Sequence, residues 1–263
     1  MVHIQVYSDI HLEFLNKSSF PKIKPLSPIL ILAGDIGHVG HKLFEPFMEY
    51  VNANWVRVYY VLGNHELYSS SHTIDKMIKR YKECIEKYPN ITLLDKEVFE
   101  DKENDIVFVG CTLWSHYHNE VPMNYVNCLN KIKRKNTNGH KVGLTREFYN
   151  EMNLDHTRWL YDTLHKYDNR NIVIITHYPC IIEGTSGPEY DNEVHKELFA
   201  NDLYLSNINN NKIICIFGHT HFSNDFVDVH GVRHIGNQFG YREELVNGSS
   251  NMKIDGKFEL FSL

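Results

Sequence analysis

The sequence of 263 residues lacks most features of secreted, membrane and disulfide-rich proteins. Its five cysteines, at positions 84, 111, 128, 180 and 215, are odd in number and form no CxxC pair. We therefore expect reduced thiols, and neither a disulfide framework nor a zinc ribbon is predicted. No apolar run approaches the roughly 18 residues of a membrane span, and the first residues do not resemble a cleavable signal. These absences predict a soluble, cytoplasmic protein without a membrane partner.

An excess of positive charge is also lacking. The chain has 27 Lys and Arg against 33 Asp and Glu, which gives a formal net charge of -6. An acidic balance argues against broad, sequence-independent binding to nucleic acid or anionic membranes. The sequence also lacks the long basic or aromatic stripe that would indicate a nuclease. A local basic run (Lys131, Lys133, Arg134, Lys135, Lys141 and Arg146) could attract a polyanionic substrate or simply face solvent.

The sequence does contain many short apolar runs bounded by turn residues. Strands are predicted at 2–7, 29–33, 56–62, 91–94, 97–100, 106–109, 172–176, 212–217, 226–229, 232–235 and 252–263, and helices at 41–52, 73–88 and 144–167. This set is typical of two packed sheets with helices outside, in a single α/β domain that spans residues 1–263. Between 115 and 143 the pattern fails, so we expect a lid insertion over an active site there.

Metal-ligand residues stand where five of these apolar runs end. The segments are Ser8-Asp9-Ile10-His11, Gly34-Asp35, Gly63-Asn64-His65-Glu66, Thr176-His177-Tyr178-Pro179 and Gly218-His219-Thr220-His221. Their positions are typical of successive loops at one edge of a sheet. Together they supply enough carboxylate, amide and imidazole donors for a site with two metal ions.

Each segment by itself has a simpler interpretation. An Asp-x-His pair is common in sequences. Any two residues at this spacing in a strand share a face, whether or not they bind a metal. Asp35 could cap a helix or lie in a turn, and residues 63–66 could form a turn. A single buried His is more often a hydrogen-bonded core residue than a ligand. The repetition at five strand ends favours the metal site, which would give Asp35 the cation that a buried charge needs.

The third segment combines three chemical roles. The amide oxygen of Asn64 can ligate a metal without adding charge, His65 can face the substrate, and Glu66 can hold the His65 ring through its other nitrogen. We therefore predict Asn64, His65 and Glu66 as the catalytic residues. The mixture of imidazole, carboxylate and amide donors suits Mn, Fe, Zn, Co or Ni better than Mg or Ca. We expect two divalent transition-metal ions, with Mn as the first candidate.

The five segments, in this order, resemble the calcineurin-like metallophosphoesterase superfamily, whose pattern runs D-x-H, G-D, G-N-H-[DE], H and G-H-x-H. The resemblance covers Asp9 to His221. It implies a four-layer αββα sandwich of two mixed sheets flanked by helices, with the active site at the carboxyl ends of the strands. It also implies a ligand set, in which Asp9, His11 and His221 hold one metal, Asn64, His177 and His219 hold the other, and Asp35 bridges them. His65 would be the acid that binds no metal.

Departures from the family pattern narrow the expected substrate. The protein serine/threonine phosphatases of this superfamily carry an Arg shortly after the second-block Asp and another beside the third block, and neither is found after Asp35 or Glu66. The GHTH segment and, more weakly, residues 237–241 resemble bacterial-type phosphoesterases and class III cyclic-nucleotide phosphodiesterases instead. Aromatic and proline residues beyond the ligands could stack on a base or aryl group, or pack locally, namely Tyr178, Pro179, Tyr190 and Tyr241.

These observations predict a hydrolase of phosphoric ester bonds. Hydroxide shared by the two metal ions would attack phosphorus in line, and His65 would protonate the leaving oxygen. The expected substrate is a small or nucleotide-like phosphomonoester or phosphodiester, and the sequence favours neither. A metal-binding scaffold of the same fold with weak catalysis, and a nuclease, stay open as alternatives. Nothing in the sequence indicates the oligomeric state.

Overall fold

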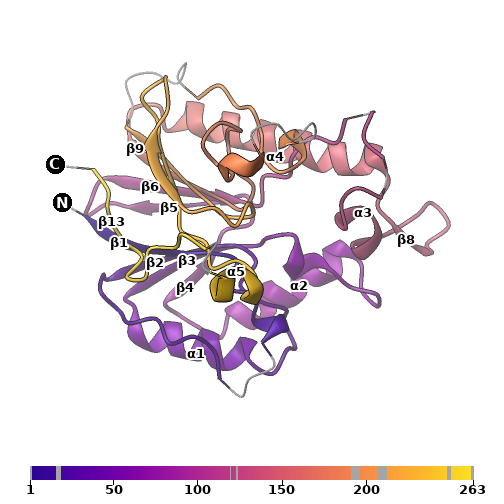
Figure 1. Cartoon of the computed structure of the whole chain (residues 1–263), viewed down its shortest axis with the longest axis horizontal. Coiled ribbons are helices and arrows are strands. Elements are labelled where there is room, and N and C mark those ends of the chain that lie inside the picture. Colours follow the sequence, from indigo (N-terminus) through magenta and orange to yellow (C-terminus); the bar gives the residue numbers. More distant parts are fainter. Residues whose placement is uncertain are drawn as a thin grey trace.

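Two large β-sheets pack face to face, with helices on their outer faces (Figure 1). The computed structural model describes residues 2–15, 19–118, 120–122, 124–190, 196–205, 212–247 and 250–261. In the described part of the chain, no helix is both long and apolar enough to cross a membrane.

The first sheet has five strands in the order β13-β1-β2-β3-β4. Four of them run parallel, namely β1 (His3–Tyr7), β2 (Ile29–Ala33), β3 (Arg57–Val61) and β4 (Ile91–Leu93), whereas β13 (Lys257–Glu259) lies antiparallel to β1. In the register, Tyr7 pairs with Leu32 and Leu32 with Tyr60. The carboxyl ends of β1, β2 and β3 therefore lie at one level.

The second sheet has six strands in the order β11-β12-β10-β9-β6-β5. Its four inner strands are parallel, namely β12 (Arg233–Gly236), β10 (Ile213–Phe217), β9 (Asn171–Thr176) and β6 (Ile106–Cys111). The edge strands β11 (Asn224–Val227) and β5 (Glu97–Asp101) are antiparallel to their neighbours. Both sheets are thus mixed, as expected.

The helices cover the outer faces of the sheets. In Figure 1, α1 (Phe44–Asn54) and α2 (Ile74–Ile85) lie on the first sheet and α4 (Arg146–Lys166) lies on the second. The shorter elements are α3 (Cys128–Lys131), α5 (Arg242–Asn247), the hairpin β7 (Lys133–Lys135) and β8 (Lys141–Gly143), and the 3-10 helices η1 (Leu12–Phe14), η2 (His65–Leu67), η3 (Pro188–Tyr190) and η4 (Lys196–Leu198).

Alternation along the strands divides the apolar residues among three cores. In β2, Ile31 faces the other sheet, and its neighbours Leu30 and Leu32 face α1 and α2. In β9, Val173 faces the first sheet, whereas Ile172 packs under α4. Parallel strands buried on both faces are apolar throughout, as these strands are. The three cores separate four layers, so the predicted αββα sandwich is confirmed.

The predicted elements recur with their ends shifted by a few residues, with two larger differences. The strand expected at 252–263 is shortened to Lys257–Glu259, and positions 262 and 263 lie outside the described residues. The segment 115–143, expected to be irregular, contains α3 and the β7–β8 hairpin, and buries Leu129 and Ile132 in the core under the first sheet. Elements of three or four residues are too short for periodicity to reveal. The lid role of this segment stays a prediction.

Candidate metal centre and active site

The predicted ligands lie at the carboxyl ends of five parallel strands. Asp9, Asp35 and Asn64 follow the adjacent strands β1, β2 and β3 of the first sheet. His177 and His219 follow the adjacent strands β9 and β10 of the second sheet. Face-to-face packing of the sheets brings the two sets together.

Asn64, His177, His219 and one oxygen of Asp35 surround a first position. His177 Nε2 lies 2.9 Å from Asn64 Oδ1 and 3.2 Å from His219 Nδ1. The same nitrogen lies 3.5 Å from Asp35 Oδ1. Tyr68 fixes the orientation of the Asn64 amide, because Asn64 Nδ2 donates to the Tyr68 hydroxyl at 2.7 Å. The amide oxygen therefore faces the imidazoles.

Asp9, His11, His221 and the other oxygen of Asp35 surround a second position. The Nε2 atoms of His11 and His221 lie 3.2 Å apart. His221 Nε2 is 3.6 Å from Asp9 Oδ1, and His11 Nε2 is 3.9 Å from Asp35 Oδ2. Asp35 thus presents one carboxylate oxygen to each position, as a shared ligand would.

The tautomers at the second position indicate that a cation belongs there. His11 Nδ1 meets Glu13 Oε1 at 3.2 Å, and His221 Nδ1 meets Glu244 Oε2 at 2.8 Å. A ring nitrogen beside a carboxylate carries the proton, which leaves a lone pair on the other nitrogen. In neutral rings the two Nε2 lone pairs then face each other across 3.2 Å. A divalent ion between them would replace this repulsion with two bonds.

The first position has the same preference for positive charge. His177 Nδ1 donates to the Ala33 carbonyl at 3.0 Å, so a neutral ring would direct its Nε2 lone pair at the Asn64 oxygen. Burial alone would lower the pKa of His177, but the Asp35 carboxylate raises it to about 9. The surroundings of His177 Nε2 thus favour positive charge at this position. The residues present fit two divalent ions.

The backbone at these ligands is strained. Only eight described non-glycine residues have a positive φ, and five of these are predicted ligands, namely Asp9, His11, Asp35, His219 and His221. Left-handed conformations are costly for residues with a side chain and cluster at functional sites. Gly63 shows that space is also restricted here, because a methyl group on it would collide with the Asp35 carboxylate. This strain is concentrated at the predicted metal ligands.

The predicted role of Glu66 as the support of the His65 ring is wrong. Glu66 Oε2 accepts from the backbone N–H groups of Asp35 at 3.0 Å and Gly63 at 2.8 Å. Its Oε1 accepts from Ile36 N at 2.7 Å and from the Tyr60 hydroxyl at 2.8 Å. The side chain is fully buried and points back under the two loops. Glu66 therefore joins the loop after β2 to the loop after β3.

The charge of Glu66 is subject to two opposing influences. Burial and the neighbouring Asp35 carboxylate raise the pKa of Glu66 to about 8. Its backbone partners Asp35 N, Gly63 N and Ile36 N can only donate, however, and among its described partners only the Tyr60 hydroxyl could accept a proton from Glu66. Several N–H donors stabilise a carboxylate strongly. We assign the ionised form to Glu66 on the basis of this geometry.

Glu13 holds the His65 ring instead. Its Oε1 lies 3.1 Å from His65 Nδ1 and 3.2 Å from His11 Nδ1, so one oxygen orients both imidazoles. Despite burial, these hydrogen bonds lower the pKa of Glu13 to about 2. His65 Nε2 is left facing the site, 4.0 Å from Asp35 Oδ2 and 3.5 Å from the Tyr241 hydroxyl.

Sequence reasoning missed three residues that support the ligands. Glu13 continues the alternation of Asp9 and His11, and this spacing was the only signal for it. Glu244 comes from α5 and Tyr68 from the end of η2, where no pattern marked either residue. Their roles depend on contacts between distant segments, which periodicity does not report.

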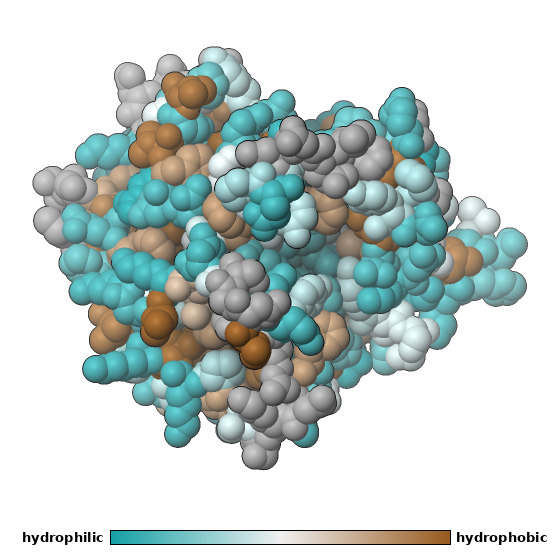
Figure 2. All heavy atoms as spheres, viewed as in Figure 1, coloured by the Kyte–Doolittle hydropathy of each residue, from teal (hydrophilic) through white to brown (hydrophobic). Residues whose placement is uncertain are grey.

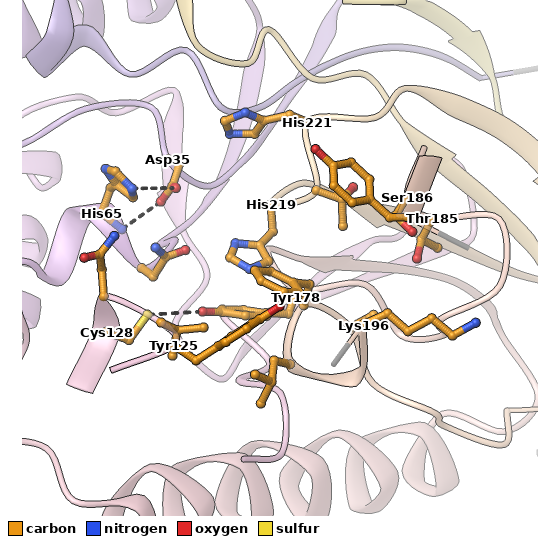
Figure 3. A pocket seen from close by; sticks show the side chains of 18 of the residues that line it. Asp35, His65, Tyr125, Cys128, Tyr178, Thr185, Ser186, Lys196, His219 and His221 are labelled. Carbon is orange, nitrogen blue, oxygen red and sulfur yellow. Dashed lines mark hydrogen bonds and ion pairs between the residues drawn. The ribbon is translucent and has the colours of Figure 1, made fainter. Parts of the chain in front are cut away.

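A pocket of about 340 Å³ opens beside the ligands. Asp35, Asn64, His65, His219 and His221 line one side, and Figure 3 shows the Asp35 and His65 side chains on this side, turned toward His219. The opposite side is largely aromatic and apolar, with residues from the 115–143 segment, from the loop after β9 and from η4, including Tyr125, Tyr190, Leu198 and Phe199. On the face shown in Figure 2, hydrophobic side chains are scattered among hydrophilic ones and the surface is hollowed near the centre.

The aromatic residues suggested by the sequence fall into two groups. Tyr190 and Tyr241 line the pocket and are half-exposed, so their rings can contact a bound group. Tyr178 also lines it but is 1% exposed, because it packs on His219 with ring centroids 3.9 Å apart. Three residues of the basic run stack on aromatic rings, with Lys131 over Tyr68, Arg134 over Phe148 and Arg146 over Tyr117.

The comparisons agree with this geometry. Residues 3–223 match the family described as calcineurin-like phosphoesterase, and the chain belongs to this family. Its members are divalent-metal-dependent phosphoesterases. An uncharacterized protein of Acanthamoeba polyphaga mimivirus is 29% identical over 274 residues, covering 96% of both chains.

Two solved structures share the fold. The phosphopantetheinyl hydrolase of Mycobacterium tuberculosis is 16% identical, with a TM-score of 0.63 over 95% of this chain and 93% of its own. A dimetal phosphatase from Danio rerio is 15% identical, with a TM-score of 0.53 over 90% of this chain and 87% of its own. At such low sequence identities, the similarity to these two structures shows a shared fold and nothing about their substrates.

Proposed function

We propose that this protein hydrolyses small or nucleotide-like organic phosphoesters with two divalent metal ions. The observation that carries the proposal is the position of Asp35, whose two carboxylate oxygens face two separate groups of ligand atoms at the wall of a pocket. When bound, two such ions neutralise phosphate charge and activate the water that attacks phosphorus. Manganese and a cytoplasmic location are part of the proposal.

The residues of the chain have distinct roles in this reaction. Asn64, His177 and His219 would hold one ion, Asp9, His11 and His221 the other, and Asp35 both. Glu66 would keep the loops that carry Asp35 and Asn64 in register, since it binds the backbone of Asp35 and of Gly63.

His65 is the proposed general acid. Its Nδ1 is held by Glu13, and its Nε2 faces the pocket. Burial opposes protonation, but the charges of Asp35 and Glu13 raise the pKa of His65 above its usual value. A protonated Nε2 can donate to the leaving oxygen as the P–O bond breaks, a contribution of about 10²- to 10⁴-fold in rate.

The shape of the pocket supports a small substrate. A volume of about 340 Å³ lies near the lower end of sites for small molecules, which begin at roughly 300 Å³. The half-exposed rings of Tyr125, Tyr190 and Tyr241 offer faces for a base or an aryl group. A pocket of this size favours a small phosphoester over a folded phosphoprotein or a duplex nucleic acid.

The test is hydrolysis by chelator-treated protein after addition of Mn, Fe, Zn, Co or Ni. p-Nitrophenyl phosphate and bis-p-nitrophenyl phosphate would report monoesterase and diesterase activity, and metal content would be measured in parallel. We expect turnover with the wild type and with the control Asp155→Asn, whose carboxylate is exposed and pairs with Lys96. Asp35→Asn should lose both metal and activity. Full metal occupancy without turnover of any ester would favour the binding scaffold.

A further inference from the structure

The pocket continues beyond the metal ligands toward a single lysine. Lys196, at the start of η4, is the only lysine or arginine among the described residues that line the pocket. In Figure 3 it lies across the view from His65 and Asp35, on the same side as Thr185 and Ser186. A cationic side chain thus stands at the other end of the pocket from His65 and Asp35.

The side chain of Lys196 is not used elsewhere in the described structure. Its ammonium forms no hydrogen bond or ion pair with any described residue, whereas several other lysines do contact neighbours. Lys131, for example, lies over the Tyr68 ring, and Lys141 donates to the Ser71 carbonyl. The half-buried Lys196 amine is therefore available to an occupant of the pocket.

The surface between the two ends is suited to an uncharged linking group. Ile182, Leu198 and Phe199 contribute apolar surface, and Tyr125 and Tyr190 contribute half-exposed rings. The acidic lining residues, Asp35 and Glu244, both lie at the metal end, in contact with ligand imidazoles. An anionic group at the far end would meet Lys196 without a neighbouring carboxylate among the described lining residues.

We propose that Lys196 binds a second anionic group of the substrate, so that the preferred substrates are phosphoesters with an anion at both ends. This inference rests on the proposed function. The phosphoryl group lies at the metal centre, the linking part lies along the aromatic and apolar wall, and a carboxylate or second phosphate meets the ammonium. A charge-assisted hydrogen bond of this kind is the strong type.

A length series of synthetic esters tests the inference. ω-Carboxyalkyl phosphates of short, medium and long chains would be compared with the uncharged ω-hydroxyalkyl phosphates of equal length. Alkanediol bisphosphates would show whether a phosphate serves better than a carboxylate. We expect the wild type to prefer the anionic member of each pair, with the highest ratio of kcat/KM values at the length that reaches Lys196.

Variants of Lys196 locate the preference. In Lys196→Met the ratio of kcat/KM for anionic over uncharged esters should fall about 10-fold, mainly through KM, which corresponds to the lower end of the range for charged hydrogen bonds. Lys196→Arg should retain the ratio, and so should the control Lys79→Met, an exposed helix lysine paired only with Glu83 among the described residues. Thermal unfolding would confirm that each variant is folded.

Different outcomes would refute the role of Lys196 and the proposed phosphoesterase activity. Equal rates for both members of every pair, or a ratio that Lys196→Met leaves unchanged, would overturn the role of Lys196 and leave the hydrolase intact. No metal-dependent hydrolysis of any ester by the wild type would refute the proposed function itself. If Lys196→Met is unfolded, a wild-type ratio that does not decline with added salt would count against the ion pair.

Discussion

Replacing Glu66 with Gln should destabilise the protein and disorganise the metal centre. The variant keeps the size of the side chain but turns one acceptor oxygen into an NH₂ donor. In the wild type, each carboxylate oxygen accepts at least two buried hydrogen bonds, with Asp35 N and Gly63 N on Oε2 and Ile36 N and the Tyr60 hydroxyl on Oε1. If the NH₂ group replaces Oε2, Asp35 N and Gly63 N lose their acceptor. If it replaces Oε1, Ile36 N and Gly37 N lose theirs, whereas the Tyr60 hydroxyl can turn and accept.

The loss of stability is set by the number of buried donors that are left without a partner. A buried donor left without a partner costs about 1–3 kcal/mol, so two of them cost about 2–6 kcal/mol. For a domain of this size, each kcal/mol lowers Tm by roughly 2–4 °C, which gives a decrease of about 4–24 °C. Metal binding should weaken too, because Glu66 joins the two loops that carry Asp35 and Asn64.

The assay is urea and thermal unfolding of metal-free protein in a chelator, which removes the contribution of bound ions to stability. Glu83→Gln is the matched control, since Glu83 is 59% exposed and pairs with Lys79 one helical turn away. It should change the free energy of unfolding by less than about 0.5 kcal/mol.

A Glu66→Gln variant as stable as the wild type would refute this reasoning, because Gln mimics a protonated Glu66. In that case the wild-type pKa of about 8 would be that of a group neutral in the folded state. A folded pKa raised above the unfolded value of about 4.3 stabilises the protein at low pH, and this contribution is lost as the pH rises toward 8. With Glu66 ionised we expect no such loss between about pH 6 and 8.

Three further predictions concern the active site. His65→Ala should retain both metals but lose about 10²- to 10⁴-fold in rate, with alkyl esters affected more than p-nitrophenyl esters; a metal content as low as that of Asp35→Asn would contradict this division of roles. The pKa of His177 is about 9 in the metal-free protein, so a metal ion must displace its proton. The apparent metal affinity, measured by equilibrium dialysis, should therefore increase up to about 10-fold for each unit by which the pH is raised toward 9. A metal affinity independent of pH would exclude that competition. Gly63→Ala should reduce metal content, since its methyl group would collide with the Asp35 carboxylate; full metal content in a folded Gly63→Ala variant would contradict this.

Much of the fold was accessible from the sequence because its strands are unusually regular. Runs such as Ile29–Ala33 and Ile213–Phe217 are apolar at every position, which is the pattern of parallel strands buried on both faces. Polar residues directly after these runs had to lie at strand ends, and the seven predicted ligands do converge there. The short elements within 115–143 were missed because three residues show no period.

The support of the site was less accessible, and Glu66 shows why. Its neighbour His65 suggested a local partnership, but a residue in a 3-10 turn directs its side chain away from its predecessor's. Glu66 points into the protein toward Asp35, 31 positions earlier in the chain, while His65 meets Glu13, 52 positions earlier. Such contacts depend on how two loops pack, and no local pattern records them.

The sequence by itself determined which side chains stand at the strand ends, and through them the ligand types and the class of chemistry. Only the tertiary structure decided which of the predicted ligand atoms face each other, that Glu13 and not Glu66 holds His65, and that Lys196 shares a pocket with the predicted metal ligands. The physical reason is that burial and alternation are local properties of a strand. The approach of Asn64 to His177, 113 positions apart, exists only once two sheets have packed against each other.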